Sequence, residues 1–114
     1  MHPSEVPTIT IDDIPSDAVL LDCREDEEWA AGHIDGALHV PMNLLPQRLN
    51  YEPGPLTPET TVVVVCKMGG RSAYVAAWLN GNGFDAVNLD GGMLAWAHAG
   101  RPMVNERGER PFVA

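Results

Sequence analysis

The stretch Thr61–Gly81, TVVVVCKMGGRSAYVAAWLNG, predicts a buried strand, a tight glycine loop and a helix. Its first part, Val62–Val65, is an unbroken β-branched run, which is typical of a strand covered on both faces. Apolar residues then recur at helical spacing behind Ser72, which is a suitable N-cap for a helix that ends near Gly81. The pattern places one cysteine, Cys66, at the point where the strand becomes the loop.

The loop can form an anion-binding bowl around the Cys66 thiol. Two glycines let the chain turn sharply and point successive backbone N–H groups inward, and the helix behind the loop adds its positive N-terminal end. A thiol at such a place should have a lowered pKa and exist largely as thiolate near neutral pH. Cys66 is therefore the predicted nucleophile, and the predicted anion- and substrate-binding loop consists of Lys67, Met68, Gly69, Gly70, Arg71 and Ser72. Besides capping the helix, the Ser72 hydroxyl has a second role open to it, a bond to the sulfur.

Length and charge narrow the classes of protein to consider. The 114 residues, 45% of them hydrophobic, predict a single domain over residues 1–114, with a core at about 6–102 and a C-terminal tail at 103–114. The formal net charge of −9 argues against nucleic acid or a membrane as a partner, because both require a basic face. Two of only seven basic residues lie in the loop, which suggests a small anion as its ligand.

The remaining composition predicts a cytoplasmic protein. The N-terminal residues show neither the basic nor the apolar region of a secretory signal, and no apolar run approaches the length of a membrane span. The two cysteines are far apart in sequence, and no Cys/His cluster has the spacing of a zinc site. We expect no metal and no other cofactor, and a monomer.

Strands and helices alternate along the whole chain. Besides the central stretch, we expect strands at residues 6–11, 18–22, 36–40 and 86–89, and helices at residues 25–31, 42–50 and 92–98. Such alternation predicts a roughly five-stranded, mostly parallel sheet with helices on both faces, in which all strands end at one edge. Ligands of such sheets bind outside that edge, where Cys66 lies. Residues 100–114 are expected to form an extended tail over the surface or to be partly disordered.

Three motifs in order resemble a single-domain rhodanese, a sulfurtransferase. The first runs from Leu21-Asp22-Cys23-Arg24 through Glu28-Trp29 and Gly32-His33-Ile34 to Gly36-Ala37, the second is the loop Cys66–Ser72, and the third is Gly91-Gly92 with Ala95-Trp96. The resemblance covers the chain roughly from Ile9 to Pro102. It implies a three-layer α/β fold of the rhodanese type.

The resemblance also implies a persulfide mechanism. The Cys66 thiolate would attack the outer sulfur of a small-molecule donor such as thiosulfate or a persulfide, and a thiophilic acceptor, cyanide or a thiol, would then remove that sulfur. The acceptor could also be carried by a protein. The residue types agree with this chemistry, because inward N–H groups and Arg71 can hold the anions and Lys67 can attract thiosulfate.

A second polar set has a structural interpretation. In the family that the chain resembles, the residues at these positions mainly fix the sheet edge and the turn before the third strand, which implies a scaffold rather than an acid–base role. The set consists of Asp22, Arg24, Glu28 and His33. Trp29, Trp78 and Trp96 are expected in the core, and Cys23 is expected to be a packing residue. A resolving thiol that reacts with Cys66 is the alternative role for Cys23.

Two other functions stay open at this point. Phosphatases and arsenate reductases of related fold have a longer loop between cysteine and arginine, whereas this chain has four residues there. The smaller bowl suits sulfur better than a tetrahedral oxyanion. A rhodanese module used only for binding is disfavoured because Cys66 and Arg71 are both present.

Overall fold

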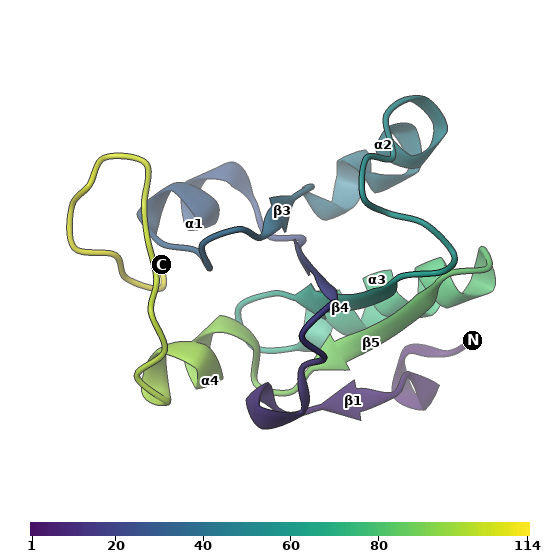
Figure 1. Ribbon diagram of the computed structural model, residues 1–114, viewed down its shortest axis with the longest axis horizontal. Coiled ribbons are helices and arrows are strands. Elements are labelled where there is room, and N and C mark those ends of the chain that lie inside the picture. The colour runs from purple at the N-terminus through teal and green to yellow at the C-terminus, as the bar shows by residue number, and fades with distance from the viewer.

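The computed structural model, drawn in Figure 1, describes all 114 residues and contains one five-stranded sheet. The strand order is β1-β5-β4-β2-β3, and every neighbouring pair is parallel. This confirms the predicted α/β class and the parallel sheet. The strands are β1 Thr8–Ile9, β2 Val19–Asp22, β3 Leu38–His39, β4 Thr61–Val65 and β5 Asp85–Leu89.

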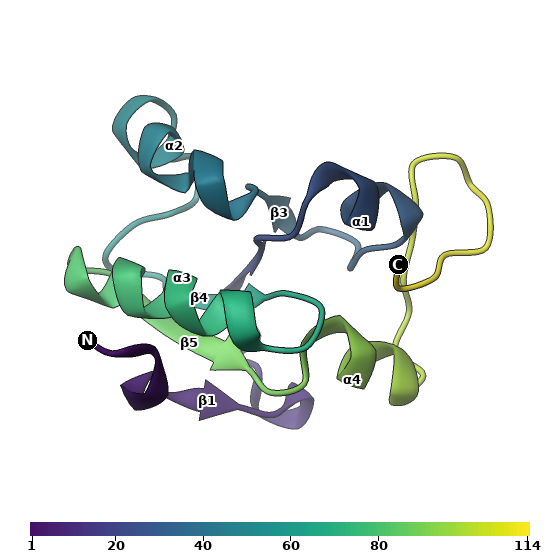
Figure 2. The ribbon, with the colours of Figure 1, turned by 180° about the vertical axis from the view of Figure 1, so that it is seen from behind.

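Helices follow the strands, and three of the four cover the two faces of the sheet, as expected for parallel connections. They are α1 Asp26–Ala31, α2 Leu45–Tyr51, α3 Gly70–Gly81 and α4 Gly92–His98, with short 3-10 turns at Pro3–Glu5, Ile11–Asp13 and Met42–Leu44. Figure 2 shows α3 lying across β4 and β5. The helix expected at residues 42–50 is thus divided into a 3-10 turn and α2, and the strand expected at residues 6–11 has only two residues between two such turns.

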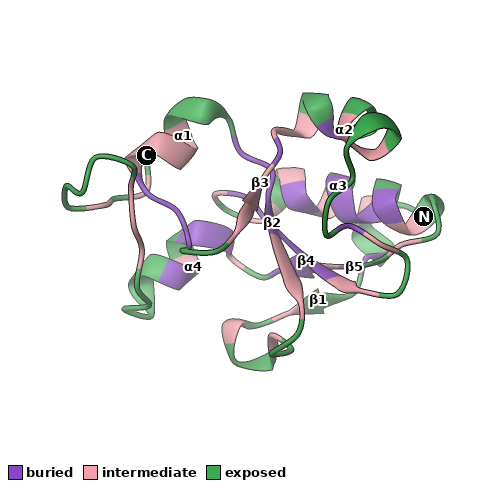
Figure 3. Cartoon of the chain, turned by 45° about the horizontal axis from the view of Figure 1, so that its top comes forward, coloured by how far each residue is buried: buried purple, intermediate pink, exposed green.

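The β4 strand is the centre of the core. The side chains of Val62 and Val64 pack into a cluster with residues of α2 and α3, whereas Val63 and Val65 pack with residues of α4 on the opposite face. All four valines are at most 1% exposed, and Figure 3 shows β4 as the buried middle of the sheet. A strand of alternating apolar and polar residues would leave one face of the sheet exposed to solvent. The continuous valine run therefore explains why helices cover both faces and the domain has three layers.

The α3 helix begins three residues before its predicted start. Gly69 is its N-cap, with a left-handed φ of 112°, and the helix runs from Gly70. The prediction that Ser72 caps the helix is therefore wrong: Ser72 lies inside the first turn and is fully buried. Its hydroxyl bonds side chains instead of the free N–H groups of the helix end.

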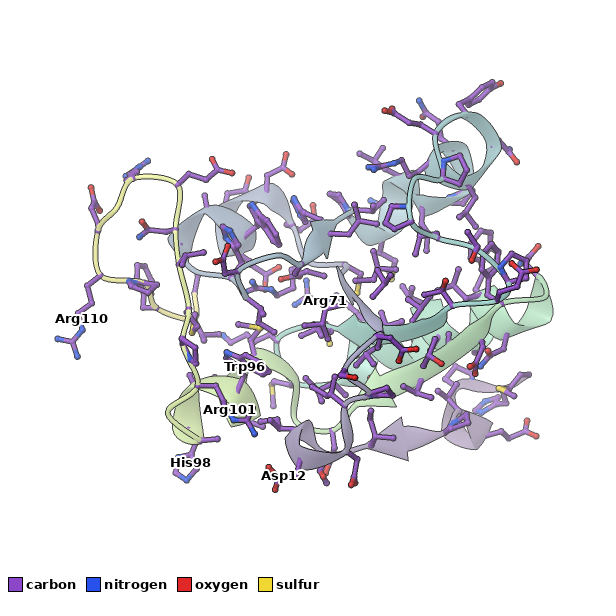
Figure 4. All side chains as sticks on the ribbon, in the orientation of Figure 1. Asp12, Arg71, Trp96, His98, Arg101 and Arg110 are labelled. Atoms are coloured by element: carbon purple, nitrogen blue, oxygen red, sulfur yellow. The ribbon has the colours of Figure 1, made fainter.

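The C-terminal segment lies over the surface in extended form, in agreement with the sequence. Val104 and His33 exchange two backbone hydrogen bonds of 2.9 Å each, and the Phe112 N–H donates to the Ala31 carbonyl. Figure 4 shows Arg101 between Trp96 and Asp12, where it ion-pairs with Asp12 at 3.1 Å. These contacts tie the segment to α1, to α4 and to the N-terminal half of the chain.

Candidate active site

Cys66 directly follows β4 and is 1% exposed. The start of α4 binds the backbone of the loop that follows Cys66. The Cys66 carbonyl accepts the Met93 N–H at 2.8 Å, and the Lys67 carbonyl accepts the Leu94 N–H at 3.1 Å. In Figure 2 the loop between β4 and α3 lies beside the first turn of α4. The first turn of α4 thus supports the loop.

The sulfur atom of Cys66 is surrounded by hydrogen-bonding groups. The Gly69 N–H donates to Sγ at 3.0 Å, and the Ser72 Oγ lies 3.2 Å from Sγ. Burial alone would raise the pKa of the Cys66 thiol, but hydrogen bonds from the Ser72 hydroxyl and from the N–H groups of Ser72, Gly69 and Met68 outweigh it and hold the pKa below its ordinary value. The structure therefore has the local features of the predicted bowl.

Arg71 is held by Glu28, which the sequence grouped with Asp22 and Arg24. The Arg71 Nη1 and Nη2 donate to the two carboxylate oxygens of Glu28 at 2.6 and 2.9 Å. This hydrogen-bonded pair lowers the pKa of Glu28 to about 2 and raises the pKa of Arg71. Arg71 is labelled inside the outline of the molecule in Figure 4, whereas Arg110 and His98 point away from it. Glu28 therefore fixes α1 to the first turn of α3.

The other three residues of the polar set make their contacts apart from the sulfur. Arg24 is fully buried, binds both oxygens of Asp22, and donates from Nη2 to the Gly32 carbonyl at 2.8 Å. The His33 Nδ1 lies 2.8 Å from the Trp29 carbonyl oxygen. None of these contacts reaches Cys66, which agrees with a structural role.

Two of the three tryptophans differ from the sequence expectation. Trp29 is half-buried and stacks between two imidazoles, with ring centroids 3.5 Å from His33 and 4.6 Å from His39. Trp78 is an exposed side chain on α3, and only Trp96 lies in the core. Helical spacing alone did not show that Trp29 of α1 contacts His39 of β3 instead of packing against the sheet face.

The remaining loop residues are half-buried or exposed to solvent. Lys67 is half-buried and forms no ion pair, and Met68 is 69% exposed. Gly70 is exposed and begins α3. Lys67 is thus the loop cation that no carboxylate binds.

Cys23 is a poor nucleophile in this structure. It is fully buried, its S–H donates to the Val65 carbonyl at 3.5 Å, and burial together with the nearby Cys66 and Asp22 raises its pKa to about 12. A resolving thiol needs thiolate character and access. The contacts of Cys23 favour the packing interpretation.

Asn88, which the sequence did not single out, and Gly92, which it placed only in the third motif, touch the site. Asn88 on β5 is buried and bonds both Ser72 and Gly69, and it interrupts an apolar strand, which was the available signal. Gly92 has a φ of +54°, and a Cβ on it would contact the Cys66 carbonyl and lie 2.8 Å from the Lys67 carbonyl oxygen. The second glycine of the Gly91-Gly92 pair thus permits the close approach of α4 to the loop.

A family model described as a rhodanese-like domain matches residues 10–99. The chain belongs to the rhodanese-like family. It is 40% identical over 93 residues to a sulfurtransferase of Allochromatium vinosum, with 81% of this chain and 83% of that one covered. It is 39% identical over 83 residues to a putative sulfurtransferase of Bacillus subtilis, which covers 73% of this chain and 77% of that one.

Solved structures agree with this membership. A rhodanese-like domain protein from Staphylococcus aureus superposes with a TM-score of 0.70 at 38% identity, over 79% of this chain and 90% of that one. The rhodanese-like fold is thus confirmed, and the sulfurtransferase relatives support a general sulfurtransferase role. None of the helices combines the length and the apolar character that a membrane span requires.

Proposed function

We propose that the protein transfers sulfane sulfur through a persulfide on Cys66. The thiolate attacks the outer sulfur of a donor such as thiosulfate, an S–S bond forms at Sγ, and sulfite leaves with the electron pair of the broken bond. Cyanide or a thiol then attacks the outer sulfur, and the electron pair of the S–S bond returns to Sγ. The donor is a small molecule, the acceptor is a small thiol or a protein-borne one, and the acting species is a cytoplasmic monomer that needs no metal or cofactor.

The observation that carries the proposal is the hydrogen bonding of the Cys66 sulfur. Gly69 N–H and Ser72 Oγ lie 3.0 and 3.2 Å from Sγ, at the N-terminal end of α3. Such donors stabilise the thiolate before the attack and the same thiolate as it is released in the second step. A thiol with a lowered pKa requires no general base, and the structure places none on Sγ.

The loop length supports sulfur transfer over phosphate or arsenate chemistry. The four residues between Cys66 and Arg71 make a short loop. Arg71 binds Glu28 through both terminal nitrogens, so part of its charge is already neutralised by a carboxylate. Lys67 is then the available charge for drawing an anionic donor toward the bowl.

The test is a steady-state assay of thiocyanate formation from thiosulfate and cyanide. A covalent intermediate predicts parallel double-reciprocal lines, and Cys66→Ala should abolish the reaction. Cys23→Ser is the matched control, because it changes the other cysteine and should keep the activity. If thiosulfate and persulfide donors yield no transfer while a phosphate ester or arsenate is turned over, the proposal is wrong.

A further inference from the structure

The Ser72 hydroxyl has two acceptors and one proton. Its oxygen lies 3.2 Å from the Cys66 Sγ and 2.5 Å from the Asn88 Oδ1, and Ser72 and Asn88 are both buried. A hydroxyl group can donate only once at a time. The sulfur and the amide oxygen therefore compete for the same proton.

The orientation of the Asn88 amide is fixed by the loop itself. Its Nδ2 donates to the Gly69 carbonyl oxygen at 3.1 Å, so that Oδ1 faces Ser72. A reversed amide would put two oxygens against each other at Gly69. The backbone is fixed as well, because Asn88 pairs with Val64 of β4 and donates its N–H to the Pro7 carbonyl at 2.8 Å.

The protonation state of Cys66 decides which acceptor the hydroxyl serves. While the sulfur is a neutral thiol, it can donate S–H to the Ser72 oxygen, and Ser72 can donate to Asn88. When the sulfur is an anion, the hydroxyl must turn to Sγ, because an anion otherwise faces the lone pairs of the oxygen. Turning leaves the buried Oδ1 of Asn88 without a donor, which is unfavourable.

We propose that Asn88 is a positioning residue of the sulfur-transfer reaction, which holds the Ser72 proton whenever the Cys66 sulfur carries no full charge. This inference rests on the proposed function. As the S–S bond forms at Sγ, the sulfur loses its charge and the hydroxyl returns to Asn88. As the acceptor breaks that bond, Sγ regains the electron pair and the hydroxyl turns back to it. Asn88 therefore stabilises the persulfide relative to the free thiolate.

The inference predicts the sign of one measurable shift. Asn88→Leu removes the competing acceptor at similar size, which frees the Ser72 proton for the sulfur. The Gly69 carbonyl still accepts the Ala73 N–H at 3.3 Å, so this oxygen keeps a partner. The thiol–thiolate equilibrium of Cys66 should move roughly three- to tenfold toward the thiolate, which is the size expected for one hydrogen bond.

The experiment is the pH dependence of Cys66 alkylation by iodoacetamide, followed by mass spectrometry. The midpoint of the pH dependence should fall by about half to one pH unit in Asn88→Leu, and it should rise in Ser72→Ala. In the double variant Ser72→Ala/Asn88→Leu, the midpoint should not fall below that of Ser72→Ala, because the hydroxyl is absent. Asn88→Ala repeats the test if leucine does not pack. Asn80→Ala is the matched control, since Asn80 bonds the backbone of Ala86 on the same strand and does not touch the sulfur.

Two outcomes would overturn the inference. An unchanged or raised midpoint in the Asn88 variants, with Ser72→Ala raised, would mean that Asn88 only supports the loop. Alkylation by iodoacetamide requires neither a sulfur donor nor a sulfur acceptor, so this result does not depend on the proposed sulfur transfer. If the shift is found but no sulfur transfer is detected in the thiocyanate assay, the assignment of Asn88 to that reaction is wrong.

Discussion

The guanidinium of Arg71 and the carboxylate of Glu28 form a two-point ion pair across 43 positions of sequence. It connects the first turn of α3, which carries the loop, with α1, which carries the acidic part of the first motif. The same carboxylate accepts the Glu25 N–H and so caps α1. One side chain thus fixes both a helix end and the arginine beside the candidate nucleophile.

Glu28→Gln should lower the free energy of unfolding at pH 7 by about 0.5–1 kcal/mol, the range of a partly exposed ion pair. The hydrogen bond from Arg71 depresses the pKa of Glu28 from 4.5 to about 2 in the folded protein. The stabilisation is therefore complete above the unfolded pKa and is lost as the pH falls through the folded one. Urea unfolding at pH 7 and at lower pH should show the gap between wild type and variant closing below about pH 5.

Glu27→Gln is the control for this pair, because Glu27 is an exposed neighbour on α1 without an ion pair. It should leave the pH dependence of unfolding unchanged. An acid dependence of Glu28→Gln identical to that of wild type would contradict the role of the Arg71–Glu28 pair.

Gly92→Ala should disturb the loop more than a glycine substitution at a comparable turn. Both Gly92 and Gly36 have positive φ values, +54° and +83°, but a Cβ on Gly92 would meet the carbonyls of Cys66 and Lys67, whereas a Cβ on Gly36 meets nothing within 4 Å. The extra loss of stability for Gly92→Ala is expected at about 1–3 kcal/mol. Thermal unfolding and thiocyanate formation measure both effects, and equal losses in the two variants would refute the contact.

Asp22→Asn should destabilise the fold strongly. The Arg24 side chain is 0% exposed, already has one terminal nitrogen without a partner, and depends on Asp22 for its counter-charge. Breaking such a buried pair typically lowers stability by about 3–5 kcal/mol. Asp12→Asn removes the exposed partner of Arg101 and should change little in the same urea titration. A small change in the free energy of unfolding for Asp22→Asn would contradict the dependence of the buried Arg24 charge on Asp22.

Cys23 should stay unreactive in the folded protein. Its pKa of about 12 and its burial predict that iodoacetamide labels only Cys66 under native conditions near neutral pH, and that Cys23 is labelled after unfolding. Peroxide should overoxidise the Cys66 thiol at the same rate in Cys23→Ser as in the wild-type protein. Faster loss in the variant would restore the resolving role that the native contacts disfavour.

The central strand and the parallel sheet could be predicted because local sequence decides them. Four consecutive valines are typical of a strand covered on both faces, and two glycines after Cys66 allow the sharp turn that the loop needs. The family-like motifs extended this to the rhodanese-like fold, which the comparisons confirm. The edges were less predictable, since the first and third strands each have only two residues and depend on a neighbour for their pairing.

The partners of the site side chains were only partly predictable from local sequence. Ser72 was expected to cap its own helix, with a bond to sulfur as its second role. The structure shows the bond to Cys66 without the cap, and adds Asn88, 16 positions away, as a partner. Glu28 was grouped with the near residues Asp22 and Arg24, yet its charge partner is Arg71. Both differences arise because the sheet brings strand ends together that are far apart in the chain.

The central claim, a persulfide on Cys66, is tested most directly by the intact mass of the purified protein. Treatment with thiosulfate, or with a persulfide donor, should add the mass of one sulfur atom, cyanide should remove it, and Cys66→Ala should show no gain. Cys23→Ser should behave as wild type. A protein that gains no sulfur from any of these donors, or one that gains it equally in Cys66→Ala, would contradict sulfur transfer through Cys66.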